Sequence, residues 1–170
     1  MDTRPARKKI RIENYDYSTP GAYFVTVCVA GKEPILWDNT DIPLTHAAPG
    51  TLQVPLSPIG QAVEAGILQI STHYANILVD KYCIMPDHIH LILSIQSGSD
   101  GRILSAPTIS TVIGSLKRWV SRRVGRTIWQ KSFIDRVIRS DSGYRAVWEY
   151  IENNPIKLDS ADDRIDLTNI

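Results

Sequence analysis

Two strand-like runs of the chain are separated only by Pro86 and Asp87. Residues 76–85, NILVDKYCIM, and residues 88–95, HIHLILSI, are both rich in β-branched and other apolar side chains. So short a break between two strands is typical of a hairpin. The rest of the chain must therefore fold around an antiparallel pair whose second strand begins with two histidines.

Periodicity predicts the elements on either side of this hairpin. In chain order we expect a strand at 22–30, a helix at 57–74, the hairpin, a helix at 109–125, a strand at 127–139 and a last helix at 140–155. With the hairpin counted as two strands, the six elements before the last helix match the ferredoxin-like split βαβ pattern. We therefore predict an α+β fold: a mostly antiparallel sheet, two helices packed on one face, and an additional C-terminal helix.

The length and composition fit one domain. The 170 residues are 43% apolar and 22% charged. We expect a basic tail at 1–20, a domain at 21–158 with a loop insertion at 31–58 that has room for a short hairpin, and an acidic tail at 159–170. Cys28 and Cys83 lie in apolar runs and are expected to be reduced, buried thiols. The chain shows neither an apolar run of membrane-spanning length nor a signal-peptide pattern, so we expect a cytoplasmic protein and no membrane partner.

Positive charge is concentrated in one part of the chain, although the net charge is only +1. Between Lys117 and Arg145 nine basic residues are opposed only by Asp135 and Asp141. Such a block is typical of proteins that bind a phosphate backbone. A solvated helix face is the alternative that charge alone leaves open.

The two histidines of the hairpin lie on one face of their strand. Alternation places His88, His90 and Ile92 on one face, and Ile89, Leu91 and Leu93 on the other, apolar face. Imidazoles two residues apart can converge on a single ion, and neutral imidazole is a common metal ligand. Two half-exposed histidines without a ligand remain the alternative.

The last helix offers a reactive group beside its core stripe. The stripe consists of Tyr144, Val147, Trp148 and Ile151. Tyr150 lies about 110° from the middle of that stripe, and Asn154 follows one turn later on the same flank. A phenol can act as a nucleophile when a metal polarises the electrophile or a base takes its proton. For a protein with a basic block, a phosphodiester is a sensible electrophile.

Four stretches of the chain resemble segments of a known family. MPDHIHLIL resembles the signature of the HUH single-tyrosine transposases. IWQKSFIDRVIR with VWEYIENNPIK, and PGAYFVTVCVAGKEPIL, resemble segments of their domesticated branch, the REP-associated tyrosine transposases. The resemblance covers roughly residues 15–158 in the same order.

This resemblance implies a metal-dependent single-stranded DNA endonuclease and strand transferase acting on hairpin-type DNA. His88 and His90 would hold a divalent ion, Mg²⁺ or Mn²⁺, with Asn154 as a third ligand. Tyr150 would be the nucleophile that forms a 5′-phosphotyrosine bond. DNA contacts are expected from the basic side chains Arg7, Lys8, Lys9, Lys117, Arg118, Arg122 and Arg123. The resemblance allows a monomer or a homodimer, and a cytoplasmic protein that joins the nucleoid when bound to DNA.

Three other functions compete with this interpretation. The chain could be a single-stranded nucleic-acid-binding module without catalysis. It could be a metal phosphoesterase in which His88 and His90 activate water. Its basic face could instead serve a protein partner. The presence of both histidines and of Tyr150 favours the transposase.

Overall fold

A four-stranded antiparallel sheet forms the centre of the computed structural model, which describes residues 15–38, 45–48, 51–53, 55–97 and 107–157. The strand order is β4-β5-β1-β6, and each neighbouring pair is antiparallel. The strands are β1 (Gly21–Cys28), β4 (Ile77–Ile84), β5 (His88–Ile95) and β6 (Ile134–Ile138). This order confirms the α+β fold with a ferredoxin-like sheet.

The hairpin of β4 and β5 is confirmed. The backbone N–H of Met85 donates to the carbonyl of His88 at 2.8 Å and closes the turn over Pro86 and Asp87. The loop after β1 holds this turn from outside, because the N–H of Val29 donates to the Asp87 carbonyl and that of Leu36 to the Pro86 carbonyl. The start of the histidine strand is therefore fixed both by the hairpin turn itself and by the loop that follows β1.

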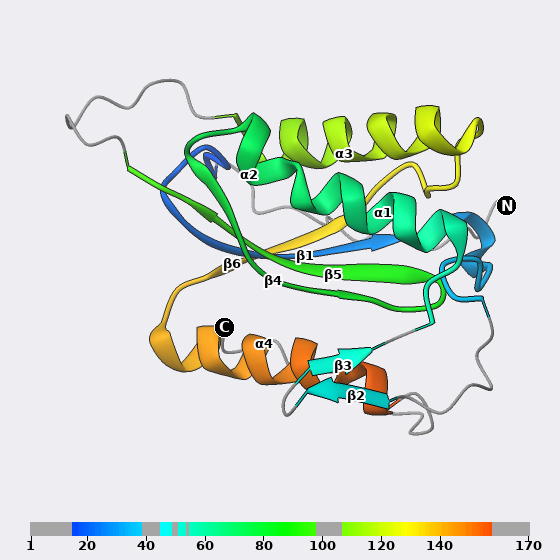
Figure 1. Ribbon diagram of the computed structural model, residues 1–170. Helices are drawn as coiled ribbons and strands as arrows, with labels where there is room; N and C mark the ends of the chain where they lie inside the picture. Colours follow the sequence, from blue (N-terminus) through cyan, green and yellow to red (C-terminus); the bar gives the residue numbers. More distant parts are fainter. Residues whose placement is uncertain (1–14, 39–44, 49–50, 54, 98–106, 158–170) are drawn as a thin grey trace, which may run out of the picture.

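Helices α1 (Pro58–Leu68), α2 (Ile70–His73) and α3 (Ile109–Val124) cover one face of the sheet (Figure 1). The larger core lies between them and the sheet and includes Ile89, Leu91 and Leu93, as their alternation predicts. Ser57 caps α1 by accepting a hydrogen bond from the Gly60 N–H.

Helix α4 (Asp141–Asn153) packs against the opposite face and continues into a 3₁₀ turn, η2 (Asn154–Lys157) (Figure 1). Val147 and Ile151 of its predicted stripe are buried in a second, smaller core with Phe24 and Ile92. The Tyr144 hydroxyl donates to Asp80 Oδ2 at 3.0 Å, and Ser94 Oγ donates to the same carboxylate. This shared acceptor ties α4 to β4 and β5.

The strand predicted at 127–139 is too long. Only residues 134–138 form β6, and Trp129 makes an isolated bridge with Val29. Between them, the carbonyls of Gln130 and Ser132 accept hydrogen bonds from Lys117 Nζ at 3.0 and 2.9 Å. A helix side chain thus takes the backbone acceptors that a continuous ladder would need.

The helix predicted at 57–74 is divided at Gln69 into α1 and α2. The loop insertion at 31–58 contains a short 3₁₀ turn, η1 (Ala30–Lys32), at its start and a hairpin of β2 (Thr45–Ala48) and β3 (Thr51–Gln53). Residues 1–14 of the basic tail and the acidic tail at 159–170 lie outside the described residues. Within the described part of the chain, no helix is long and apolar enough to span a membrane.

Candidate active site on the histidine face

The register of the sheet gathers the site on the face that α4 covers. His88 of β5 lies opposite Cys28, and His90 lies opposite Thr26 of β1. Phe24, on the same face of β1, stacks on the His90 ring with centroids 5.2 Å apart. The cost of placing two imidazoles on this face is therefore partly offset by aromatic packing.

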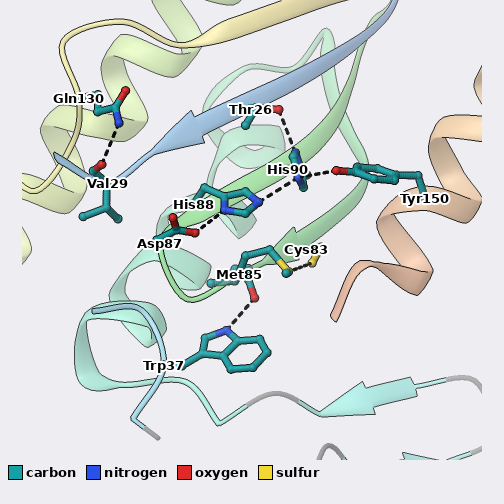
Figure 2. Close-up of polar contacts among 11 residues, drawn as sticks. Thr26, Val29, Trp37, Cys83, Met85, Asp87, His88, His90, Gln130 and Tyr150 are labelled. Atoms are coloured by element: carbon teal, nitrogen blue, oxygen red, sulfur yellow. Dashed lines mark hydrogen bonds and ion pairs between the residues drawn. The ribbon is translucent and has the colours of Figure 1, made fainter. Parts of the chain in front are cut away.

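The two imidazoles point toward each other. His88 Nε2 and His90 Nε2 are 3.1 Å apart (Figure 2). His88 Nδ1 lies 2.6 Å from Asp87 Oδ1, and His90 Nδ1 lies 2.9 Å from Thr26 Oγ1. Because an ionised carboxylate only accepts hydrogen bonds, His88 donates through Nδ1 and keeps the lone pair of its Nε2 directed into the site.

Tyr150 reaches this pair from α4. Its hydroxyl oxygen lies 3.4 Å from His90 Nε2 (Figure 2). Its ring packs edge-on against Phe24. The phenol is half-buried, as expected for a residue on the flank of the core stripe. Two imidazole nitrogens from β5 and a phenol oxygen from α4 are therefore joined in a chain of contacts through His90.

His90 is held in the neutral form. Burial and the neighbouring His88 lower the pKa of His90 well below its ordinary value. A neutral imidazole has a lone pair available for a metal ion.

The donor set fits a divalent ion. Two imidazoles that share one ion, with N–metal bonds of about 2.1 Å at right-angled to tetrahedral geometry, place their nitrogens roughly 3.0–3.4 Å apart. The observed 3.1 Å lies in that range. Within the described residues no three His, Cys, Asp or Glu side chains form a ligand group. Further ligands would have to be other groups, such as an amide, a phenol, water or substrate.

Asn154 is buried at the junction of α4 and η2, with 2% of its surface exposed. Its amide Nδ2 has no hydrogen-bond acceptor among the described residues. A buried donor of this kind usually has an acceptor, which can be an ordered water molecule, whereas a cation would bind the amide oxygen instead. Its role as a third ligand stays a prediction.

The predicted DNA-contacting residues separate into two groups. Lys117, Arg118, Arg122 and Arg123 lie on α3, across the sheet from the histidine face. Lys117 is half-buried and bound to two carbonyls, so part of its role is structural. Arg7, Lys8 and Lys9 lie outside the described residues. Tyr23 and Trp129, aromatic side chains of a kind that can stack on bases, are buried core residues.

Sequence patterns did not single out the residues that orient the histidines. Asp87 was visible only as part of a turn, although its position directly before His88 is a local signal. Thr26 and Phe24 could be found only from the pairing of β1 with β5, which brings residues 64 positions apart into contact.

Relatives were found by sequence. No protein-family model matches the chain. An uncharacterized protein of Haemophilus influenzae is 25% identical over 169 residues, which cover 88% of each chain. A predicted REP-associated tyrosine transposase of the same organism is 25% identical over 156 residues, covering 86% of this chain and 77% of that protein.

A solved structure shares the fold. The structure of a REP-associated tyrosine transposase bound to a REP hairpin superposes with a TM-score of 0.61 and 21% identity, covering 86% of this chain and 74% of that one. The fold is thus the α+β fold of that transposase structure. The chain is similar to REP-associated tyrosine transposases in sequence as well as in fold, which confirms the resemblance predicted from its motifs.

Proposed function

We propose that this protein is a transposase of the REP-associated tyrosine type: a metal-dependent, single-stranded DNA endonuclease and strand transferase. Hairpin-type DNA is its proposed substrate. The similar transposase was solved with a REP hairpin, which supports this choice of substrate. The proposal also accounts for a basic helix in a protein whose net charge is close to zero.

One observation carries the proposal. His88 Nε2, His90 Nε2 and the Tyr150 hydroxyl converge, with separations of 3.1 and 3.4 Å between neighbouring atoms. A core built for stability alone would fill this space with apolar side chains. The orienting contacts of Asp87 and Thr26 support a functional pair, because metal-binding histidines commonly have such partners on their second nitrogen.

The reaction would begin with attack by the Tyr150 oxygen on the scissile phosphorus. The bond from phosphorus to O3′ breaks, a bond from phosphorus to Tyr150 Oη forms, and the phenol proton passes to water. The leaving O3′ takes a proton from water and becomes a free 3′-hydroxyl. Attack by that or another 3′-hydroxyl reverses the linkage and rejoins DNA, so no nucleotide cofactor is required.

His88 and His90 would hold a divalent ion, Mg²⁺ or Mn²⁺, with Asn154 as a candidate third ligand, and the ion would supply Lewis-acid polarisation of the phosphate. Asp87 and Thr26 would keep the two imidazoles oriented. Phe24 and α4 would shield the site from bulk water, since Phe24 packs against both His90 and Tyr150.

Covalent trapping tests this function. Labelled hairpin DNA with single-stranded flanks, taken from the protein's own genomic neighbourhood, is incubated with protein and Mn²⁺ or Mg²⁺ and run on a denaturing gel. We expect a protein–DNA band that disappears with EDTA and in Tyr150→Phe. Tyr74→Phe, which changes a tyrosine on the other sheet face, serves as the matched control and keeps the band.

Two outcomes would overturn the proposal. DNA binding without any adduct, across several hairpins, would identify a binding module. Cleavage that continues in Tyr150→Phe would identify a phosphoesterase in which the histidine site activates water.

A further inference from the structure

A hollow of about 380 Å³ lies between the C-terminal half of α3 and residues 127–131. Four cationic side chains and two hydroxyl side chains line it: Lys117, Arg118, Arg122, Lys131, Ser121 and Thr127. The hollow is open to the surface, so a ligand can enter it from the solvent. It is separate from the histidine site, which lies on the other face of the sheet.

The positive charge of this hollow is not compensated locally. From Ile109 to Ile134 the sequence contains six basic residues and no acidic one. Within the described part of the chain, none of the four lining cations pairs with a carboxylate. Burial lowers the pKa of Lys117, which shows that its charge is held against a desolvation cost. A bound anion would offset that cost.

The hollow also offers uncharged donors. Ser121 and Thr127 bring hydroxyl groups, and Trp129 lines the same hollow. The Trp129 indole N–H is buried and has no acceptor among the described residues. Buried donors are nearly always paired, so an unpaired one beside a cationic hollow is consistent with a ligand or an ordered water.

The sheet links this hollow to the histidine site. The N–H of Gln130, which also lines the hollow, donates to the Cys28 carbonyl, and Cys28 lies opposite His88 in the ladder. Two strand spacings, about 10 Å, therefore separate the backbone at Gln130 from that at His88. Figure 1 shows the C-terminal ends of α3 and α4 at the same end of the sheet, on opposite faces.

We propose that this hollow is a second phosphate subsite, which binds a backbone phosphate of the same DNA strand a few nucleotides from the phosphate at His88 and His90. The strand would pass around the end of β1 and rest on the α3 face. The inference depends on the proposed function for the identity of its ligand, a phosphodiester of single-stranded DNA. Cations and hydroxyls at one open site are suited to backbone phosphate rather than to base edges.

The test measures binding in EDTA, where no cleavage occurs. Fluorescence anisotropy gives the Kd for hairpin DNA with a single-stranded flank at several salt concentrations. Arg122→Ala combined with Lys131→Ala removes two exposed cations of the hollow. Arg126→Ala combined with Arg139→Ala removes two exposed cations outside it and serves as the matched control.

We expect the first pair to weaken binding by roughly tenfold and to reduce the salt slope by about 0.7 for each phosphate that the protein no longer neutralises. The control pair should show a much smaller change. A scan of DNA oligomers, each with one uncharged methylphosphonate, should reveal a flank position that weakens binding to the parent protein. That position should have no effect on the Arg122→Ala/Lys131→Ala protein.

Other outcomes would overturn the inference. Equally weakened binding in the hollow variant and in the control variant would show that the hollow contributes only general positive charge. A methylphosphonate effect that persists in the first pair would place that phosphate elsewhere. Inorganic phosphate that binds as tightly as DNA would indicate a site for a free anion. The binding assay does not depend on Tyr150. If the hollow variants bind DNA as the parent protein does while covalent trapping succeeds, the phosphate subsite is wrong and the proposed function still stands. A parent protein that does not bind DNA would overturn both the subsite and the proposed function.

Discussion

The Tyr150 hydroxyl lies 3.4 Å from His90 Nε2 of the same chain, sixty positions earlier in the sequence. Helix α4 folds back over the sheet face that carries the histidines, so one copy of the protein contains both halves of the proposed site (Figure 1). It can therefore be tested whether the proposed nucleophile, Tyr150, comes from the same copy of the protein as the two histidines.

Mixing two inactive variants should not restore activity. Tyr150→Phe lacks the phenol, and a His88→Ala/His90→Ala double variant lacks the imidazoles. Since each site is completed within one chain, we expect the mixture to give no more covalent DNA adduct than either variant alone. A recovered adduct on the histidine-deficient chain would show that α4 is exchanged between two copies.

The contacts to the outer histidine nitrogens should control metal affinity. We expect Asp87→Asn and Thr26→Val each to weaken Mn²⁺ binding by about 10- to 100-fold, because the imidazoles lose the partners that orient them. Titration with detection of free Mn²⁺ by electron paramagnetic resonance measures this affinity. Thr26→Ser keeps the hydroxyl and should bind almost as the parent protein does; equally weak binding in the Val and Ser variants would contradict the orienting role.

Asp80 should position the tyrosine helix. Its carboxylate accepts hydrogen bonds from Tyr144 and Ser94, so Asp80→Asn should loosen α4 on the sheet. We expect about tenfold slower adduct formation, unchanged DNA binding and faster amide exchange in α4. Glu152→Gln removes only the exposed contact with Lys81 and should have little effect, since such pairs contribute about 0–1 kcal/mol. Unchanged exchange in Asp80→Asn would contradict the prediction.

Stability should fall in alkaline solution. Burial raises the pKa of Cys83 from 9.0 to about 12, and burial together with the hydrogen bond to Glu64 raises that of Tyr82 from 10.0 to about 12. The stability from each group is complete below its unfolded pKa and is lost as the pH rises toward the folded pKa. Urea titrations should therefore show a falling free energy of unfolding between pH 9 and pH 12. Tyr82→Phe should flatten the upper part of that decline, and a constant free energy would contradict the prediction.

The Leu36 backbone approaches Gly60 closely, so a larger residue at this position should be unfavourable. A Cβ atom at this position would lie 2.1 Å from the carbonyl oxygen of Leu36, so Gly60→Ala should destabilise the fold by about 3 kcal/mol. Gly114→Ala meets only the flexible end of Arg118 and should stabilise α3 by about 0.5–1 kcal/mol. Thermal or urea unfolding measures both. Tolerance of alanine at Gly60 would show that the loop at Leu36 is easily displaced.

Local signals in the sequence were sufficient for most elements. Alternation over 88–95 defines β5 without error, and the residues that cap the helices, Ser57 before α1 and Gly125 after α3, are of the types that favour these positions. These features depend on residues within one turn or one strand. The prediction of a strand at 127–139 was wrong in its length. Lys117, from another element, binds the backbone carbonyls of Gln130 and Ser132, which are therefore not paired in the sheet. Composition carries no information about such a contact.

The sequence by itself determined the fold class, the face on which His88 and His90 lie, and the place of Tyr150 on the flank of the last helix, because period-2 and period-3.6 patterns specify which side chains share a face. Only the tertiary structure decided that the three groups meet, that Asp87 and Thr26 orient the imidazoles, and that the basic side of α3 lies across the sheet. These relationships depend on strand register and on the side from which each helix packs, and both are settled by contacts between residues far apart in the chain.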